Sequence, residues 1–135
     1  MTGERNLERL MEHMEPELQT GVYVFCTFST LREEIPAICW FCEKEGWTAI
    51  VQKEMAERLG LLEEGGAAFE SAWITLKVHS DLQAVGFLAA ISQALAAEGI
   101  PCNVVSGYYH DHLFVPVEKS QAVLEILARL QSSGG

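Results

Sequence analysis

His79, Asp81, His110, Asp111 and His112 are the residues whose types and spacing could do chemistry. Histidine is the commonest side chain that binds transition metals, and it also changes charge near neutral pH. His110 and His112 could lie on either side of a turn, and no fourth metal ligand stands out. Three alternatives therefore remain open for this run: a metal site, a contact to a ligand or a proton, and a purely structural turn.

The segment after His79 has the features of a helix start. Ser80 is followed three positions later by Gln83, as in a capping box. Apolar residues then repeat at helical spacing, and Gly99 fits a left-handed C-cap: Val85, Leu88, Ile91 and Leu95. The pattern predicts a helix that begins at Ser80, with unpaired N–H groups able to bind a carboxylate.

Small and polar residues near this helix start could complete a ligand site. Asp81 could bind an amino group, Gly86 could allow a close approach, and Asn103 offers donors and acceptors. We predict a site at the 79–86 loop formed by eight residues: His79, Ser80, Asp81, Val85, Gly86, Asn103, His110 and His112. Structural alternatives remain, because Ser80 and Asp81 could be helix caps and Gly86 could serve helix packing.

Alternating apolar residues predict the strands that position this site. Residues 73–79, 100–105 and 112–117 each alternate, and 118–130 has a helical apolar stripe. The order strand, helix, strand, strand, helix is the ferredoxin-like plan without its last strand. We expect the strand at 22–28, or another from the first half, to fill that slot, so that two halves are interleaved. The rim then depends on the end of strand 73–79 lying beside the 107–111 turn.

Three stretches of this region carry a resemblance to a known family. The runs V-H-S-D-L-Q-A-V-G-F-L-A, L-A-A-E-G-I and G-Y-Y-H-D-H-L-F-V-P are similar to ACT domains, the regulatory modules of amino-acid biosynthetic enzymes. The closer resemblance is to stand-alone bacterial proteins with paired ACT-like halves, related to the regulatory region of aspartokinases. It implies an α+β, ferredoxin-like fold with antiparallel sheets and helices on one face. It also implies binding of an amino acid at the strand-helix loop, often between paired domains, and we expect a homodimer.

The first half of the chain is predicted to contain two helices and three strands. A helix is predicted from Leu7 to Met14, ending before Pro16, followed by strands at 22–28, 35–42 and 47–51 and a helix at 52–59 stopped by Gly60. The glycine-rich stretch 62–68 suggests a boundary, with an N-terminal half at 1–65 and a C-terminal half at 66–135. We expect residues 131–135 to be a disordered tail.

Cys39 and Cys42 have C-x-x-C spacing, which can indicate zinc or redox chemistry. In a strand, however, residues three apart point to opposite faces, and no second pair completes a zinc set. We predict that all the cysteines are reduced and buried in the core.

Composition and charge exclude several classes of function. The chain has 135 residues and a net charge of -10, so a polyanion such as nucleic acid is not expected as a partner. No apolar run could span a membrane, and no signal peptide is evident, so we expect a cytoplasmic protein. No nucleophile elbow, P-loop or dinucleotide motif occurs, so neither an enzyme nor a cofactor is expected. The leading hypothesis is a metabolite sensor; the alternatives are a metal-binding protein using the hairpin histidines and a ligand-free interaction module.

Overall fold

The structure, a computed structural model, describes residues 3–64 and 69–132. The chain divides into two compact units. The first unit comprises Met1–Gln19 and Ala72–Gly135, and the second comprises Thr20–Ser71. The expected boundary between residues 65 and 66 lies outside the described residues.

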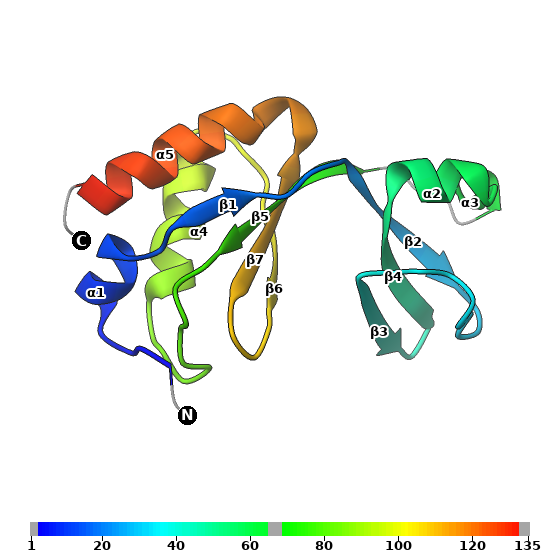
Figure 1. Ribbon diagram of the computed structural model, residues 1–135, viewed down its shortest axis with the longest axis horizontal. Coiled ribbons are helices and arrows are strands. Elements are labelled where there is room, and N and C mark those ends of the chain that lie inside the picture. The colour runs from blue at the N-terminus through cyan, green and yellow to red at the C-terminus, as the bar shows by residue number, and fades with distance from the viewer. Residues whose placement is uncertain (1–2, 65–68, 133–135) are drawn as a thin grey trace. The chain divides into compact units, whose positions relative to one another are not determined.

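The first unit contains a sheet with the strand order β1-β5-β7-β6. Its strands are β1 (Pro16–Leu18), β5 (Glu70–Leu76), β6 (Asn103–Ser106) and β7 (Asp111–Pro116), and its helices are α1 (Leu7–Glu12), α4 (Phe87–Ala97), η1 (Val117–Lys119) and α5 (Ser120–Ser132) (Figure 1). The chain order from β5 to α5 is strand, helix, strand, strand, helix, as predicted. This confirms the α+β, ferredoxin-like class.

One face of this sheet packs against the helices. Alternate residues of β5 and β7 point into a common core with apolar residues of α1, α4 and α5, all fully buried: Ile74, Leu76, Leu113, Val115, Leu10, Ile91, Leu95, Val123 and Leu127. The intervening residues Trp73 and Phe114 point to the opposite face, where their rings stack 6.1 Å apart. The period-2 pattern therefore assigned the buried face of β5 correctly.

The open slot beside β5 is filled by β1. Pro16 pairs with Leu76 and Leu18 with Ile74, in an antiparallel ladder. The interleaving was thus expected correctly, and strand 22–28 does pair with β5, but only at Glu70 and Ser71. The strand 16–18, which pairs with residues 74–76, was missed, because Pro16 indicated only a helix end.

Helix α4 begins at Phe87, and the prediction that it begins at Ser80 is wrong. Its N-cap is Gly86, whose φ of 91° lies in the left-handed region, and Ser80 caps no helix. The C-terminal prediction is confirmed. Gly99 has a φ of 71°, and the amide of Ile100 donates to the carbonyl of Leu95, as in a Schellman motif.

The second unit repeats the antiparallel plan with fewer helical turns. β2 (Tyr23–Phe28) pairs with β4 (Gly46–Gln52), β4 pairs with β3 (Cys39–Glu43), and β2 also pairs with Glu70 and Ser71 at the start of β5. Helices α2 (Lys53–Arg58) and α3 (Leu61–Glu64) follow β4, and a small core includes Val24, Ala49, Val51, Ala56 and Leu61. No element of regular structure lies between β2 and β3, where the first unit has α4 between β5 and β6.

Two further sequence predictions need correction. All four cysteines are free, but only Cys26 is buried; Cys39 and Cys102 are partly buried, and Cys42, on the edge strand β3, is exposed. Residues 131 and 132 belong to α5 rather than to a disordered tail, and 133–135 lie outside the described residues.

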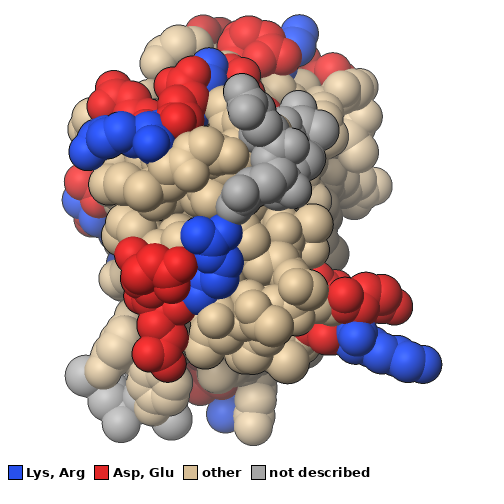
Figure 2. All heavy atoms as spheres, turned by 90° about the vertical axis from the view of Figure 1, so that its right-hand side faces the viewer, with Lys and Arg blue, Asp and Glu red and all other residues tan. Residues whose placement is uncertain are grey.

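The charged side chains show no basic patch on the face drawn in Figure 2. Acidic side chains gather there in several groups, and Lys and Arg side chains lie beside them. Among the described residues on this face, nothing resembles the basic surface that a polyanion requires. In the part of the chain that the structure describes, no helix is both long and apolar enough to cross a membrane.

Candidate functional site

The segment that directly follows β5 lies beside the tip of the β6–β7 hairpin, as the sequence predicts. The His79 ring centroid is 5.4 Å from that of Tyr109 and 6.5 Å from that of Tyr108. On the same edge, Nδ1 of His110 lies 3.4 Å from the carbonyl oxygen of Val78. These contacts define a rim formed by the 77–86 loop and the 107–111 turn, both in the first unit.

Ser80 and Asp111 link the two parts of this rim. The hydroxyl of Ser80 donates a 2.8 Å hydrogen bond to Oδ2 of Asp111. Both residues are buried, with exposed fractions of 6% and 5%. Ser80 is therefore a long-range connector, and the buried carboxylate that it holds was not among the predicted ligand-binding residues.

The side chain of His112 lies on the other face of the sheet from that of Asp111. Neighbouring residues of a strand face opposite sides of the sheet, so Asp111 and His112 diverge. Nδ1 of His112 accepts a 3.0 Å hydrogen bond from Nε1 of Trp73, and it lies 3.1 Å from Oγ1 of Thr75. Burial lowers the pKa of His112, with a smaller contribution from His110.

The divergence of these side chains does not support the metal alternative. Within residues 3–64 and 69–132, no group of three or more His, Cys, Asp and Glu side chains could hold a metal ion. The buried Asp111 is bound to Ser80, and His112 is bound on the other face of the sheet.

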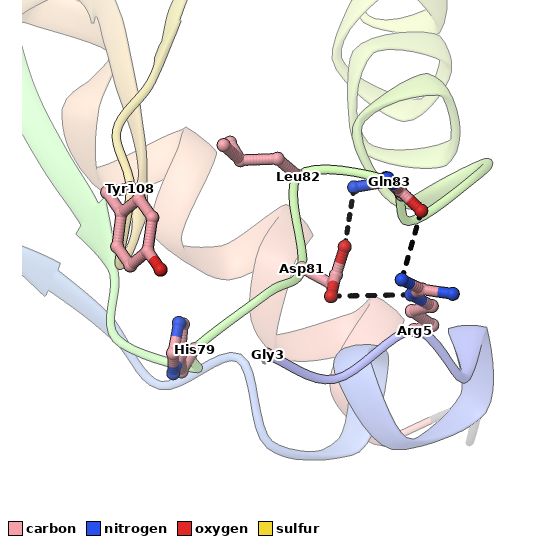
Figure 3. Close-up of a pocket in the computed structure, with 7 residues that line it drawn as sticks. All are labelled: Gly3, Arg5, His79, Asp81, Leu82, Gln83 and Tyr108. Carbon is pink, nitrogen blue, oxygen red and sulfur yellow. Dashed lines mark hydrogen bonds and ion pairs between the residues drawn. The ribbon is translucent and has the colours of Figure 1, made fainter. Parts of the chain in front are cut away.

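Two pockets adjoin at the rim and share Asp81 and Leu82. The first, which we call the loop pocket, has a volume of about 200 Å³ (Figure 3) and is lined by Gly3, Arg5, His79, Asp81, Leu82, Gln83 and Tyr108. The second, which we call the helix pocket, has a volume of about 130 Å³ and is lined by residues of the loop, of α4 and of the hairpin: Ser80, Asp81, Leu82, Ala84, Gly86, Phe87, Leu88, Ala89, Ser106 and Asp111.

The helix pocket combines a helix start with acidic side chains. Helix α4 has no side-chain N-cap, and its first residues, Phe87 to Ala89, line the pocket. Backbone N–H groups at a helix start favour an anionic group. Asp81 and Asp111 line the same pocket, and an acidic side chain favours a cationic group.

Arg5 was missed by sequence reasoning. Its Nε lies 3.3 Å from Oδ2 of Asp81, and its Nη2 donates a 3.0 Å hydrogen bond to Oε1 of Gln83 (Figure 3). The amide of Gln83 donates to Oδ1 of Asp81 at 2.7 Å. The pKa of Asp81 is lowered, chiefly by the hydrogen bond from this amide and to a smaller extent by Arg5. No local sequence signal indicates so distant a pairing.

The structure brings together only part of the predicted set. His79, Ser80, Asp81 and Gly86 each line one or both pockets. His110 contacts the strand end without lining either pocket, and His112 faces the other side of the sheet. Val85 is 84% exposed and lines neither pocket. Asn103 pairs with Phe114, at the end of the hairpin opposite its turn.

Comparison with known families assigns both parts of the sequence. One ACT domain profile matches residues 2–68, and a second ACT domain profile matches residues 68–129. The chain belongs to the ACT domain family. The paired ACT domains agree with the resemblance inferred from the loop and hairpin sequences.

Solved structures show the same fold. The chain is 41% identical to VC0802 from Vibrio cholerae, a protein of unknown function and possible transport protein, with a TM-score of 0.81 and coverage of 93% of this chain and 95% of that one. The regulatory subunit of aspartate kinase from Thermus thermophilus is similar in fold, with a TM-score of 0.64, 15% identity and coverage of 85% and 96%. That from Thermus flavus has a TM-score of 0.62, 12% identity and coverage of 85% and 95%. A comparison with the curated proteins gave no match.

Proposed function

We propose that this ACT protein is a non-catalytic regulatory module that binds a free amino acid at the 79–86 loop. The observation that carries the proposal is the convergence of an uncapped helix start and two aspartates on one pocket. The similarity to regulatory subunits of aspartate kinase supports a regulatory role.

The uncapped start of α4 suits the carboxylate of an amino acid. The amide of Ala90 donates to the carbonyl of Gly86 at 2.9 Å and is the first amide of the helix paired within it. The preceding amides, those of Phe87, Leu88 and Ala89, are thus left for another acceptor, and these residues line the helix pocket. A bound carboxylate would meet both these donors and the positive end of the helix dipole.

The carboxylates of Asp81 and Asp111 suit the ammonium group of the same ligand. Asp111 is held by Ser80, so its position is fixed before a ligand arrives. His79 and Tyr108 line the adjoining loop pocket, where a ligand side chain would lie. A pocket of about 130 Å³ beside one of about 200 Å³ suits a small metabolite.

A thermal-shift screen with each common amino acid tests this proposal. A ligand at 100 times its Kd adds about 2.7 kcal/mol to the free energy of unfolding. We expect one chemical class of amino acid to raise Tm and the others to leave it unchanged. The Asp81→Asn variant should lose most of this shift, whereas Glu98→Gln, a control at the other end of α4, should keep it. Flat melting temperatures across the set would contradict the proposal.

We also propose that the chain forms a homodimer through the exposed apolar side chains of the rim. Leu82, Val85, Tyr108 and Tyr109 are exposed by 63%, 84%, 62% and 59%. Large apolar side chains gathered on one surface are typical of contact sites. Light scattering should give the mass of a dimer for the wild type. The Val85→Glu/Tyr109→Glu variant should shift toward the monomer, whereas an unchanged mass would contradict this contact.

A further inference from the structure

A short segment before α1 lies along the ligand loop. Residues 3–6, which we call the strap, form an isolated parallel bridge in which Glu4 pairs with Ser80. The amide of Glu4 donates to the carbonyl of His79 at 2.7 Å, and the amide of Asp81 donates to the carbonyl of Glu4 at 2.9 Å. The strap thus holds the backbone of the loop on both sides of Ser80.

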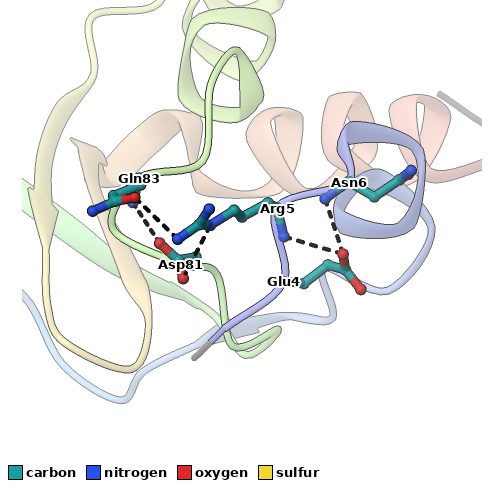
Figure 4. A network of polar contacts seen from close by, with 5 residues as sticks. All are labelled: Glu4, Arg5, Asn6, Asp81 and Gln83. Atoms are coloured by element: carbon teal, nitrogen blue, oxygen red, sulfur yellow. Dashed lines mark hydrogen bonds and ion pairs between the residues drawn. The ribbon is translucent and has the colours of Figure 1, made fainter. Parts of the chain in front are cut away.

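Arg5 extends this contact to the side chains of the loop. Its guanidinium reaches both Asp81 and Gln83, at 3.3 and 3.0 Å, and the loop closes on itself through the bond from Gln83 to Asp81 (Figure 4). Asp81 is one of the two carboxylates proposed to bind the ligand's ammonium group. While Arg5 is in place, part of that carboxylate is already occupied by a cation.

Gly3 makes the close backbone approach possible. A Cβ atom at this position would lie 2.6 Å from the amide nitrogen of Asp81, 2.6 Å from the carbonyl carbon of Ser80 and 2.7 Å from the carbonyl oxygen of His79. All three neighbours are backbone atoms, so no side chain can move aside to make room. Any other residue at this position would therefore force the strap and the loop apart.

Residues 3–5 of the strap can leave without unfolding the unit, whereas Asn6 stays with α1 as its N-cap, accepting from the amides of Arg9 and Leu10. Arg5 and Asn6 are exposed, and the strap contributes no side chain to the buried core. By contrast, α1 is anchored by Leu10 and Met11, whose exposed fractions are 0% and 4%. Segments with few buried contacts open at low free energy while their neighbours stay folded.

We propose that the 3–6 strap is a releasable clamp on the ligand site: it holds the 79–83 loop closed and occupies Asp81, and ligand binding requires Arg5 to leave. The proposal rests on the proposed function, because it describes the regulation of the same site. It makes the strap a competitor of the ligand's ammonium group for one carboxylate.

Hydrogen exchange of single amides in the protein without ligand tests the clamp directly. In Gly3→Ala and Arg5→Ala, the amide of Asp81 should exchange about tenfold faster than in the wild type, since its acceptor on Glu4 is lost or loosened. Amides of Leu113 and Val115 in the core should be unchanged, which shows that the variants are folded. Arg129→Ala is the matched control, because Arg129 makes an ion pair of the same length, 3.3 Å, with Glu98, and the two arginines are similarly exposed, by 58% and 67%. An Asp81 amide as protected in both variants as in the wild type would overturn the proposal.

Binding measurements separate the clamp from the proposed function. For an amino acid found in the screen, Arg5→Ala should bind about threefold to fivefold more tightly than the wild type, as expected from removing one partly exposed ion pair. Arg129→Ala should bind like the wild type. Equal or weaker binding by Arg5→Ala would overturn the competition. If no amino acid binds any variant, the proposed function fails, and the exchange rates of the Asp81 amide still decide whether the strap holds the loop.

Discussion

Ser80 and Asp111 form a buried hydrogen bond of 2.8 Å between the ligand loop and the β6–β7 hairpin. A buried carboxylate that loses its partner keeps its desolvation cost. The effects of these two residues on stability should therefore be coupled.

We predict that Ser80→Ala lowers the free energy of unfolding by about 1–3 kcal/mol, because Asp111 then lacks the hydroxyl donor. Asp111→Asn should cost less, since an amide can still pair with Ser80. Urea denaturation of the two single variants and the double variant gives the coupling energy. Strictly additive effects would show that the bond contributes nothing.

We predict that stability falls as the pH drops below about 6.5, and that His112 contributes to this fall. The pKa of His112 is lowered in the folded state, so the unfolded state binds more protons between the lowered value and 6.5. Its stabilising contribution is complete above the unfolded pKa and is lost as the pH falls toward the folded one. Protonation would also place a proton on Nδ1, the atom that accepts from Trp73.

Melting curves recorded on both sides of pH 6.5 check this prediction. His112→Asn keeps an acceptor near Trp73 but does not titrate, so its Tm should fall less with pH than that of the wild type. His13→Asn, on the exposed end of α1, is the control and should follow the wild type. Identical pH profiles for all three proteins would contradict the assignment.

We predict that Gln19→Pro destabilises the first unit by about 1–3 kcal/mol. The amide of Gln19 donates to the carbonyl of Trp73 at 2.8 Å, which continues the β1–β5 ladder, and proline has no N–H group. Gln19→Ala is the control, because it loses only the side-chain bond to Thr75. Equal free energies of unfolding for the two variants would show that the β1 ladder is dispensable.

We predict that Gly86→Ala and Gly99→Ala each cost about 1–2 kcal/mol, because both glycines have positive φ angles. Neither would bring a Cβ atom into a close contact, so the cost is conformational. Only Gly86 lies at the start of α4, so only Gly86→Ala should also weaken amino-acid binding. Calorimetry on both variants separates the effects, and equal loss of affinity in both would contradict a site at the start of α4.

Short-range sequence patterns predicted the helices and strands better than they predicted which strands and side chains pair. The alternation of Ile74 and Leu76 identified a half-buried strand, because one face of that strand packs on the helices, although β5 ends at Leu76 and not at residue 79 as predicted. Gly99 was placed correctly, because a left-handed residue after a helix has a strong local signal.

The wrong helix start at Ser80 and the missed strand β1 both result from partners that lie far away in the sequence. Ser80 and Gln83 have the spacing of a capping box, but their side chains bind Asp111 and Arg5 instead. β1 has three residues and begins with a proline, so only the free edge of β5 makes it a strand. Side-chain partners that lie far apart in the sequence leave no periodic pattern.

The origin of β1 also limits how this protein can be divided. A fragment starting at residue 69 would keep β5, α4, β6, β7 and α5, yet it would lack β1 and α1. Its β5 edge would be unpaired, and the apolar surface covered by Leu10 and Met11 would meet water. The second ACT repeat therefore cannot be separated from residues 1–19 without exposing a strand edge and an apolar surface, and both features favour aggregation. Only the whole chain carries the module intact.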